Sequence, residues 1–229
     1  LSSKSPNLQN IPVRSEMGRS IRKGFVSRDG YKLLSLDYSQ IELRLLAHFS
    51  GDKVLLESFH NNADIHAETA KLLFKDSNKD FSLLRSIAKS INFGLIYGMG
   101  ARKLSQTLNI TQTEAKQYIE NYFATFPSVK QFLESQKDSI LKNGYSTTLL
   151  GRKRYFDFFS ATEFMRANFL REGVNTIFQG SAADLIKLSM NEIYKKIESL
   201  HNDCFMLLQV HDELIFEIKD SIIESLSKE

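Results

Sequence analysis

Two strongly apolar runs that meet at a polar dipeptide constrain the fold more than any other feature. FMLLQV and ELIFEI occupy residues 205–210 and 213–218, and His211 and Asp212 separate them. Short apolar runs that flank a polar turn are typical of a β-hairpin. The sequence therefore predicts two neighbouring antiparallel strands, with Asp212 in the turn between them.

A second strand region lies near the start of the chain. Residues 25–39, FVSRDGYKLLSLDYS, predict a strand, a turn at Asp29-Gly30 and a second, apolar strand that ends at Asp37. The following residues, 40–49, repeat apolar side chains at helical spacing. A strand that ends in an acidic residue and turns into a helix is well placed to present a carboxylate at the edge of a sheet.

Helical periodicity dominates the long region between these strands. We expect helices over residues 64–75, 81–97, 112–125, 128–143, 161–178 and 181–200. Gly180 is expected to separate the last two, because glycine weakens a helix interior. Thr111 and Glu114 have the spacing of a capping box, and residues 145–156, YSTTLLGRKRYF, predict a short β-hairpin or a strand-loop segment. Helices between distant strands predict an α+β fold with an antiparallel sheet.

Composition narrows the class of protein without identifying it. The 229 residues are 42% hydrophobic and 25% charged, which suits a globular chain. The net charge of +3 permits an anionic partner without requiring one, and the single Cys204 excludes an internal disulfide framework. No apolar run approaches the roughly 20 residues that a membrane-spanning helix needs, so we expect no membrane partner. The sequence begins at Leu1 rather than at methionine, and we expect it to be part of a longer protein.

Residues 1–24 are predicted to be irregular, because they show little helical or strand periodicity. Their basic residues are Lys4, Arg14, Arg19, Arg22 and Lys23, against one acidic residue, Glu16. A solvated loop and an arm that contacts phosphates explain this charge equally well.

Asp37 and Asp212 attract attention because acidic residues beside apolar strands usually have a partner. Ordinary turn chemistry also explains Asp212, since aspartate favours tight turns. If the two strand regions are neighbours, however, the carboxylates converge, and a divalent cation would relieve their repulsion. Carboxylate oxygens suit Mg²⁺, and two such ions about 3.5–4 Å apart can stabilise the attacking and leaving oxygens of a phosphoryl transfer.

The helix expected over residues 81–97 carries a stripe of two cations and two aromatic rings. Arg85, Lys89, Phe93 and Tyr97 follow one another at i+4 on one side of the helix. The cations suit a triphosphate, and the rings offer flat surfaces to a sugar and a base. The alternative is a surface Arg-Lys pair above a Phe-Tyr pair in the core.

Several segments closely resemble motifs of the family A DNA polymerases, of the bacterial DNA polymerase I type. The three signature motifs are matched by DYSQIELR at 37–44, RSIAKSINFGLIYG at 85–98 and QVHDELIFE at 209–217. Further segments similar to this family are SPNLQNIPVR at 5–14, DIHAETA at 64–70 and FQGSAADLIK at 178–187. The resemblance covers almost the whole chain, with the motifs in the family's order.

The resemblance implies an antiparallel palm sheet that carries the metal carboxylates and a mostly helical fingers subdomain. It places the palm at residues 1–50 and 146–229 and the fingers at residues 51–145. The implied activity is template-directed DNA synthesis in replication and repair, in which dNTPs are added to a primer 3′-OH and pyrophosphate is released. The implied partners are primer-template DNA, dNTP and two Mg²⁺ ions. We expect a monomer in the bacterial cytoplasm, at the nucleoid, or in an organelle if the source is eukaryotic.

The resemblance also implies roles for matching residues. Metal binding falls to Asp37, Asp212 and the carbonyl group of Tyr38, with Glu213 as a nearby catalytic acid. Nucleotide binding falls to Gln40, Glu42, His66, Arg85, Lys89, Phe93 and Tyr97. Lys89 would also act in catalysis by protonating pyrophosphate. DNA binding falls to Arg14, Arg171, Asn175, Gln179 and His211. Without the resemblance, His66 and His211 would be interpreted as structural histidines.

Two other classes of protein stay open. A single-subunit RNA polymerase shares the Asp, Arg/Lys and Tyr framework, but Glu42 would fill the space that a ribose 2′-OH needs. A DNA-binding module without catalysis would have lost a metal carboxylate or the Arg85-Lys89 pair, and all of these are present. The family's thumb and nuclease domains are absent from the sequence, so we expect the isolated chain to have weak activity or none.

Overall fold

The computed structural model describes residues 7–12, 15–75, 78–200 and 202–228. Contacts within the chain divide it into two units. Unit 1 comprises Leu1–Ser39 and Leu185–Glu229, and unit 2 comprises Gln40–Asp184. The boundaries predicted for palm and fingers remain a prediction.

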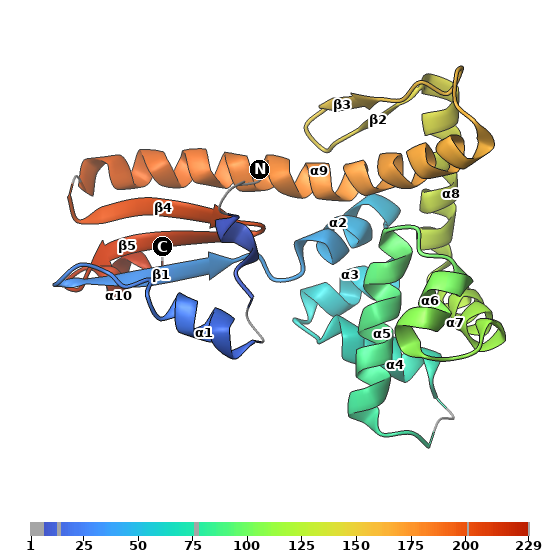
Figure 1. Ribbon diagram of the computed structural model, residues 1–229, viewed down its shortest axis with the longest axis horizontal. Helices are drawn as coiled ribbons and strands as arrows, with labels where there is room; N and C mark the ends of the chain where they lie inside the picture. The colour runs from blue at the N-terminus through green and yellow to red at the C-terminus, as the bar shows by residue number, and fades with distance from the viewer. Residues whose placement is uncertain (1–6, 13–14, 76–77, 201, 229) are drawn as a thin grey trace. The chain divides into compact units, whose positions relative to one another are not determined.

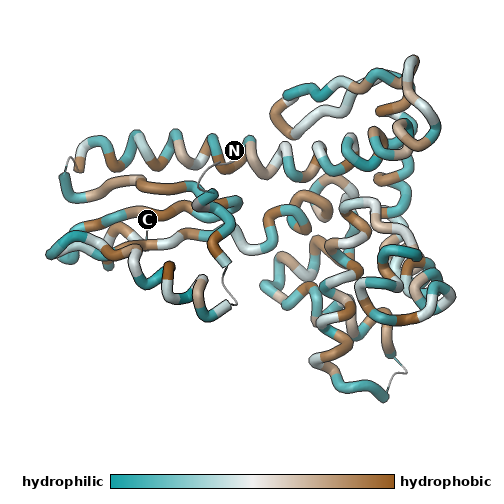
Figure 2. The backbone as a smooth tube through the Cα atoms, in the orientation of Figure 1, coloured by the Kyte–Doolittle hydropathy of each residue, from teal (hydrophilic) through white to brown (hydrophobic). Residues whose placement is uncertain are grey.

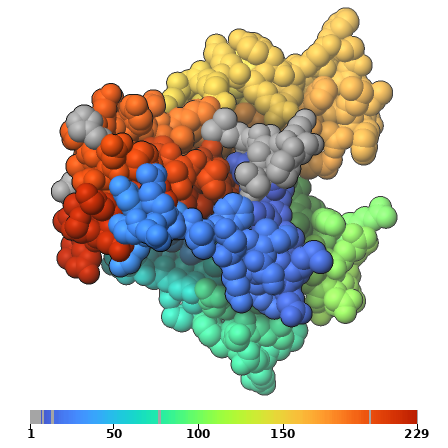
Figure 3. All heavy atoms as spheres, turned by 60° about the vertical axis from the view of Figure 1, so that its left-hand side comes forward, coloured from blue at the N-terminus to red at the C-terminus, as the bar shows by residue number. Residues whose placement is uncertain are grey.

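Unit 1 contains an antiparallel sheet that joins the two predicted strand regions. Its strands are β1 (Tyr31–Asp37), β4 (Cys204–Val210) and β5 (Glu213–Lys219), in the order β1-β5-β4. β1 therefore pairs directly with β5, although the two are far apart in sequence (Figure 1). In Figure 3 the blue residues of β1 lie against the orange-red residues of the C-terminal strands. The mixed α+β architecture with an antiparallel sheet is confirmed.

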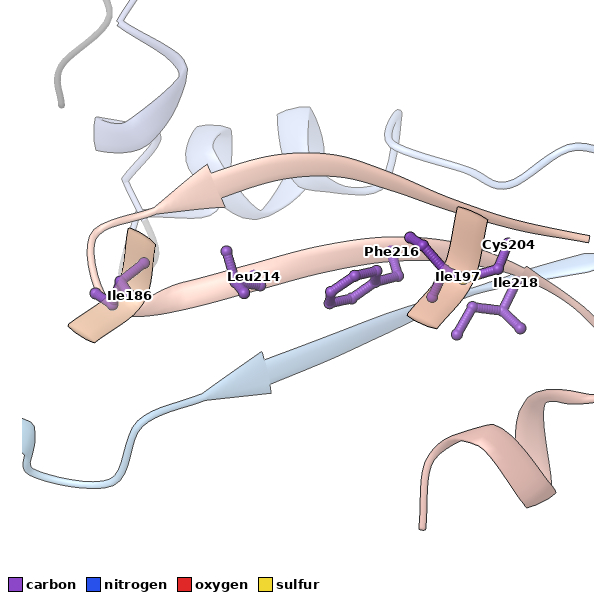
Figure 4. Close-up of a cluster of buried hydrophobic side chains, with 6 residues drawn as sticks. All are labelled: Ile186, Ile197, Cys204, Leu214, Phe216 and Ile218. Carbon is purple, nitrogen blue, oxygen red and sulfur yellow. The ribbon is translucent and has the colours of Figure 1, made fainter. Parts of the chain in front are cut away.

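One face of this sheet forms the core of unit 1. The cluster comprises Ile186 and Ile197 from α9 (Glu163–Ile197), Cys204 from β4, and Leu214, Phe216 and Ile218 from β5 (Figure 4). Side chains of α10 (Ile223–Leu226) pack against the same cluster. Because strand residues alternate between faces, Leu34 lies on this face, whereas Leu33, Ser35 and Asp37 lie on the other.

The start of unit 1 differs from the prediction of irregular structure. η1 (Leu8–Asn10) is a short 3-10 helix, and α1 (Glu16–Arg22) is an α-helix. The hydroxyl of Ser15 accepts a hydrogen bond from the backbone N–H of Gly18 at 3.1 Å, so that a local cap begins α1. The prediction was wrong here because it weighed apolar periodicity, which this short basic helix lacks.

The strand predicted before Asp29-Gly30 is also absent, since residues 25–28 form no strand. The side chain of Glu217 takes the place of a strand partner. It accepts hydrogen bonds from the backbone N–H of Arg28 at 2.9 Å and from Arg28 Nε at 2.8 Å. The segment is therefore held to β5 by the side chain of Glu217, and residues 25–28 form no backbone hydrogen bonds of a β-ladder.

Unit 2 is mainly helical. Its helices before the β-hairpin are α2 (Ile41–Ser50), α3 (Lys53–His60), α4 (Ile65–Leu73), α5 (Phe81–Ile96), α6 (Ala101–Leu108), α7 (Gln112–Thr125) and α8 (Pro127–Asn143). The capping box predicted at Thr111 and Glu114 is present at the start of α7. α3 and α6 were not predicted. Apolar segments such as α2 and β4 are largely brown in Figure 2, whereas many turns are teal.

Aromatic rings join α2, α8 and α9 in the interior of unit 2. The ring of Phe49 is stacked on that of Phe132, with centroids 5.8 Å apart, and Phe178 packs edge-on against both. Phe178 is fully buried. This cluster fixes the end of α2, the helix that follows the acidic strand β1.

The predicted hairpin at residues 145–156 is confirmed as β2 (Tyr145–Thr147) and β3 (Lys153–Tyr155). It contacts α9, which runs unbroken past Gly180, so the predicted division into two helices was wrong. Ser181 Oγ accepts a hydrogen bond from the backbone N–H of Leu149 at 2.8 Å, and Arg152 forms an ion pair of 2.8 Å with the buried Asp184. These contacts outweigh the cost of about 1 kcal/mol that glycine brings to a helix interior.

Among the helices of the described ranges, none combines the length and the apolar character that a membrane span needs.

Gly180 is required for this contact, which gives a test of the packing. A Cβ atom at position 180 would lie 2.5 Å from Thr148 Cγ2. Thr148 cannot turn away freely, because its hydroxyl donates a hydrogen bond of 2.5 Å to Asp184 Oδ2. We expect Gly180→Ala to lower the free energy of unfolding by about 1–3 kcal/mol in urea titrations, despite the better helix propensity of alanine.

The companion change is Thr148→Ser, which removes the methyl group and keeps the hydroxyl. In that background, Gly180→Ala should cost little stability or gain some. An equal loss in both backgrounds would show that the methyl contact does not explain the glycine.

Candidate active site

Asp37 and Asp212 are neighbours in unit 1, so the condition for convergence of their carboxylates is met. Asp37 ends β1 and lies opposite Glu213 in the register of β1 and β5. Asp212 occupies the turn between β4 and β5, where Val210 pairs with Glu213. The backbone N–H of Tyr38 donates a hydrogen bond of 3.1 Å to the carbonyl oxygen of Asp212. This bond ties the end of β1 directly to the turn.

The acidic groups repel one another. Burial raises the pKa of the Asp37 carboxyl above its ordinary value, and the negative charges of Asp212 and Glu213 raise it further. Among the residues that the structure describes, neither Asp37 nor Asp212 has an ion-pair partner. The site therefore holds a local excess of negative charge that a cation would relieve.

The donor set suits a metal that takes few protein ligands. Within the described ranges, no group of three or more His, Cys, Asp and Glu residues could hold a metal ion. Two carboxylates and a backbone carbonyl do not make a closed site. They do fit Mg²⁺, which commonly uses one or two carboxylates and takes its other ligands from water and phosphate.

Neighbouring side chains fix this edge of the sheet. The hydroxyl of Ser35 donates a hydrogen bond to Glu213 Oε1, which holds that carboxylate on the face of Asp37. Tyr38 Oη lies 2.5 Å from Ser189 Oγ on α9. Tyr38, whose carbonyl group is a predicted metal ligand, is therefore held both by its backbone N–H and by its side chain. His211 has a left-handed backbone with a φ of 56°, and Gln209 Nε2 donates a hydrogen bond of 2.6 Å to its carbonyl oxygen.

In unit 2, α5 presents the predicted stripe. Arg85 and Lys89 are exposed, whereas Phe93 and Tyr97 are half-buried. Arg85 Nε donates a hydrogen bond of 2.7 Å to Asp64 Oδ2, at the start of α4. The two cations are therefore exposed and the two rings partly covered. This arrangement is compatible both with nucleotide binding and with a surface Arg-Lys pair beside a Phe-Tyr pair in the core.

His66 is buried and satisfied by a neighbouring amide. Its Nδ1 lies 3.1 Å from Asn92 Nδ2, and its ring centroid lies 5.5 Å from that of Phe93. Burial lowers the pKa of His66; Asp64 opposes this effect, while Lys89 and Arg85 add to it. These contacts are those expected of a structural histidine, and its role toward a nucleotide remains a prediction.

Glu42 and Tyr97 form a direct contact. Tyr97 Oη donates a hydrogen bond to Glu42 Oε2, so the C-terminal end of α5 is linked to the first turn of α2. Gln40 precedes α2 with a left-handed φ of 56°, and its side chain does not cap the helix. Two residues that the family resemblance assigns to nucleotide binding, Glu42 and Tyr97, are therefore in direct contact.

The predicted DNA-binding residues have different settings. Arg171, Asn175 and Gln179 follow at i+4 along α9, and the first and last of them are exposed. Asn175 Oδ1 is buried and has no hydrogen-bond partner among the described residues. His211 is exposed in unit 1, and Arg14 lies outside the described residues. DNA binding by these residues remains a prediction.

Several residues that hold the predicted site residues in place were not predicted from the sequence. Ser35, Asn92 and Ser189 contact Glu213, His66 and Tyr38, respectively. Asp64, which binds Arg85, had a local signal, because it precedes a helical segment in the manner of an N-cap. The other contacts depend on tertiary structure and had no such signal.

The repulsion at Asp37 predicts that removing one charge stabilises the protein in the presence of a chelator. Asp212→Asn should raise the unfolding temperature by about 1–2 °C, since solvent screening limits repulsion between exposed groups to about 0.5 kcal/mol. Because the pKa of Asp37 is raised in the folded state, wild-type stability should fall as pH rises from the ordinary carboxyl pKa to the raised one. That fall should be smaller in Asp212→Asn.

Asp220→Asn is a suitable control, because Asp220 pairs with Lys32 at 3.8 Å rather than with another acid. A lower unfolding temperature for Asp212→Asn than for the wild type, with metal removed, would contradict the repulsion.

Comparison with known proteins identifies the family of this chain. Residues 1–229 match DNA polymerase family A. The chain is 57% identical over 230 residues to DNA polymerase I of Helicobacter pylori, covering 100% of this chain and 26% of the relative. It is 44% identical to the thermostable DNA polymerase I of Thermus aquaticus, covering 100% of this chain and 27% of the relative. The chain thus spans about a quarter of the length of these relatives.

A solved structure is similar over the whole chain. It is the POL domain of Pol1 from M. smegmatis, in complex with DNA primer-template and dNTP, with a TM-score of 0.92 and 40% sequence identity. The match covers 100% of this chain and 41% of that chain. With the whole sequence matched by the family and the fold matched by one of its polymerase domains, the chain belongs to DNA polymerase family A.

Proposed function

We propose that this chain is the catalytic region of a DNA polymerase that extends a primer 3′-OH with dNTPs. The observation that carries the proposal is the approach of Asp37 and Asp212 at one edge of the sheet, without an ion-pair partner among the described residues. Family membership and a similar domain in complex with DNA primer-template and dNTP support the substrate class. The activity, in replication and repair, would belong to the protein of which this chain is a part.

Asp37, Asp212 and the carbonyl group of Tyr38 would hold two Mg²⁺ ions. When bound, these ions would supply charge stabilisation at the attacking and leaving oxygens. The 3′-oxygen would attack the α-phosphorus, and the bond from that phosphorus to the bridging oxygen of pyrophosphate would break. Lys89, an exposed ammonium group on α5, would donate a proton to the departing pyrophosphate.

The nucleotide would be bound mainly through α5 and its neighbours. Arg85 offers a guanidinium fork and Lys89 a point charge to the triphosphate. The half-buried Phe93 would contact the sugar, and Tyr97 would lie beside the templating position. Gln40 and His66 would surround the triphosphate, with His66 acting from its buried site through the residues that it contacts.

DNA would be bound by residues that tolerate every sequence. Arg171, Asn175 and Gln179 line one side of α9, and with Arg14 and His211 they would contact the primer-template minor groove. Acceptors in that groove are shared between base pairs, which suits an enzyme that must copy any template. We propose that the enzyme acts as a monomer. We also propose that it acts in the bacterial cytoplasm, since the relatives described above come from bacteria.

The metal assignment is tested by Asp212→Ala. In the full-length protein, single-turnover dNTP incorporation with Mg²⁺ should fall by about 10²–10⁴-fold, because metal ions supply several kcal/mol of transition-state stabilisation. Asp220→Ala, at the other end of β5, is the matched acidic control and should retain the wild-type rate. A near-normal rate for Asp212→Ala would refute the assignment.

Glu42 provides a test that distinguishes a DNA polymerase from an RNA polymerase. It is held by Tyr97, and its side chain would occupy the space of a ribose 2′-OH. Glu42→Ala should reduce the preference for dNTP over rNTP at least about tenfold in competition on a primed template. Glu57→Ala, on the exposed surface of α3, should leave the preference unchanged. A wild-type protein that prefers rNTP would favour the RNA polymerase.

A further inference from the structure

We propose that Asp64 is a positioning residue that holds the guanidinium group of Arg85 by Nε, so that its outer nitrogens face a triphosphate. The inference rests on the proposed function, in which Arg85 binds the nucleotide. Asp64 would not touch the nucleotide. It would act by orienting the side chain that does.

The two oxygens of Asp64 have separate partners. Oδ1 accepts hydrogen bonds from the backbone N–H groups of His66 at 3.0 Å and Ala67 at 3.1 Å, which caps α4. Oδ2 accepts the hydrogen bond from Arg85 Nε at 2.7 Å. The cap fixes the direction of the carboxylate, because both backbone donors belong to the first turn of a helix. Arg85 therefore meets an acceptor that is already oriented.

The contact engages only one edge of the guanidinium group. Arginine carries five N–H donors, and the bond to Asp64 uses the one on Nε. Arg85 has no other hydrogen-bond or ion-pair partner among the described residues. Its side chain is 44% exposed. The Nη1 and Nη2 groups therefore remain for an oxyanion, and together they can bind a phosphate in bidentate fashion.

Electrostatics keep Asp64 ionised for this role. Burial by itself raises the pKa of Asp64, but the hydrogen bonds from Arg85, Ala67 and His66 and the charge of Arg85 outweigh it, so that the pKa lies below its usual value. An exposed ion pair of this kind contributes little to folding. Its value lies in geometry, because a long side chain that is already oriented loses less freedom when it binds a ligand.

A simple competitor for Arg85 would behave in the opposite way. If Asp64 had to release Arg85 before a triphosphate could bind, removing its charge would tighten nucleotide binding. The use of Nε alone favours positioning over competition, because one guanidinium group can bind a carboxylate by Nε and a phosphate by its outer edge at the same time.

The test measures the dNTP dissociation constant and the maximal incorporation rate separately, by single-turnover titration of the full-length protein on a primed template. Asp64→Asn and Asp64→Ser both keep a capping oxygen for α4 and remove the charged acceptor. Each should weaken dNTP binding about three- to tenfold, with a smaller change in the maximal rate. Asp80→Asn is the matched control, since Asp80 caps α5 through Leu83 and should leave binding unchanged.

The Arg85→Ala background separates positioning from a structural role. There, Asp64→Asn should no longer weaken dNTP binding, because the side chain to be oriented is gone. Equal weakening in both backgrounds would overturn the inference in favour of a cap that merely supports α4. Unchanged or tighter binding by Asp64→Asn alone would also overturn it. If Arg85→Ala itself leaves dNTP binding unchanged, the proposed role of Arg85 fails, and the inference fails with it.

Discussion

The pairing of β1 with β5 is the constraint on which the candidate metal site depends. It brings Asp37 to the turn that carries Asp212, although the two residues are far apart in sequence. The carboxylates repel one another there, and packing of α9 against the opposite face of the sheet supports the strands that hold them. Sheet and core thus maintain a concentration of negative charge that a divalent cation would neutralise.

The helical unit meets a different requirement, which is to present cations and rings in fixed orientations. Short contacts restrain its long polar side chains: Tyr97 holds Glu42, and Asp64 holds Arg85. His66 is kept in place by Asn92 within the same unit. Together these contacts place the charged groups of α4 and α5 on helices that are capped by Asp64 and Asp80 and have buried faces.

Features decided by local chemistry could be predicted from the sequence, and those decided by distant contacts could not. The turn at Asp212 and the capping box at Thr111 follow from neighbouring residues alone. The unbroken α9 does not, because Gly180 is favoured there by Thr148 of the hairpin. Likewise, the strand expected at residues 25–28 is absent, and the side chain of Glu217 binds the backbone N–H of Arg28 instead. The types of residue in the site could be predicted from the sequence. The contacts of Asp64 with Arg85 and of Ser35 with Glu213 could not, because they form only in the tertiary structure.

Direct measurement of metal binding tests whether Asp37 and Asp212 together form a divalent-cation site, as we propose. Mn²⁺ can replace Mg²⁺ at oxygen ligands, and its free concentration can be followed by electron paramagnetic resonance in the presence of dNTP. We expect Asp37→Asn and Asp212→Asn each to weaken Mn²⁺ binding at least about tenfold, and Asp220→Asn to leave it unchanged. Equal Mn²⁺ affinity in all four proteins, the wild type included, would contradict the proposal.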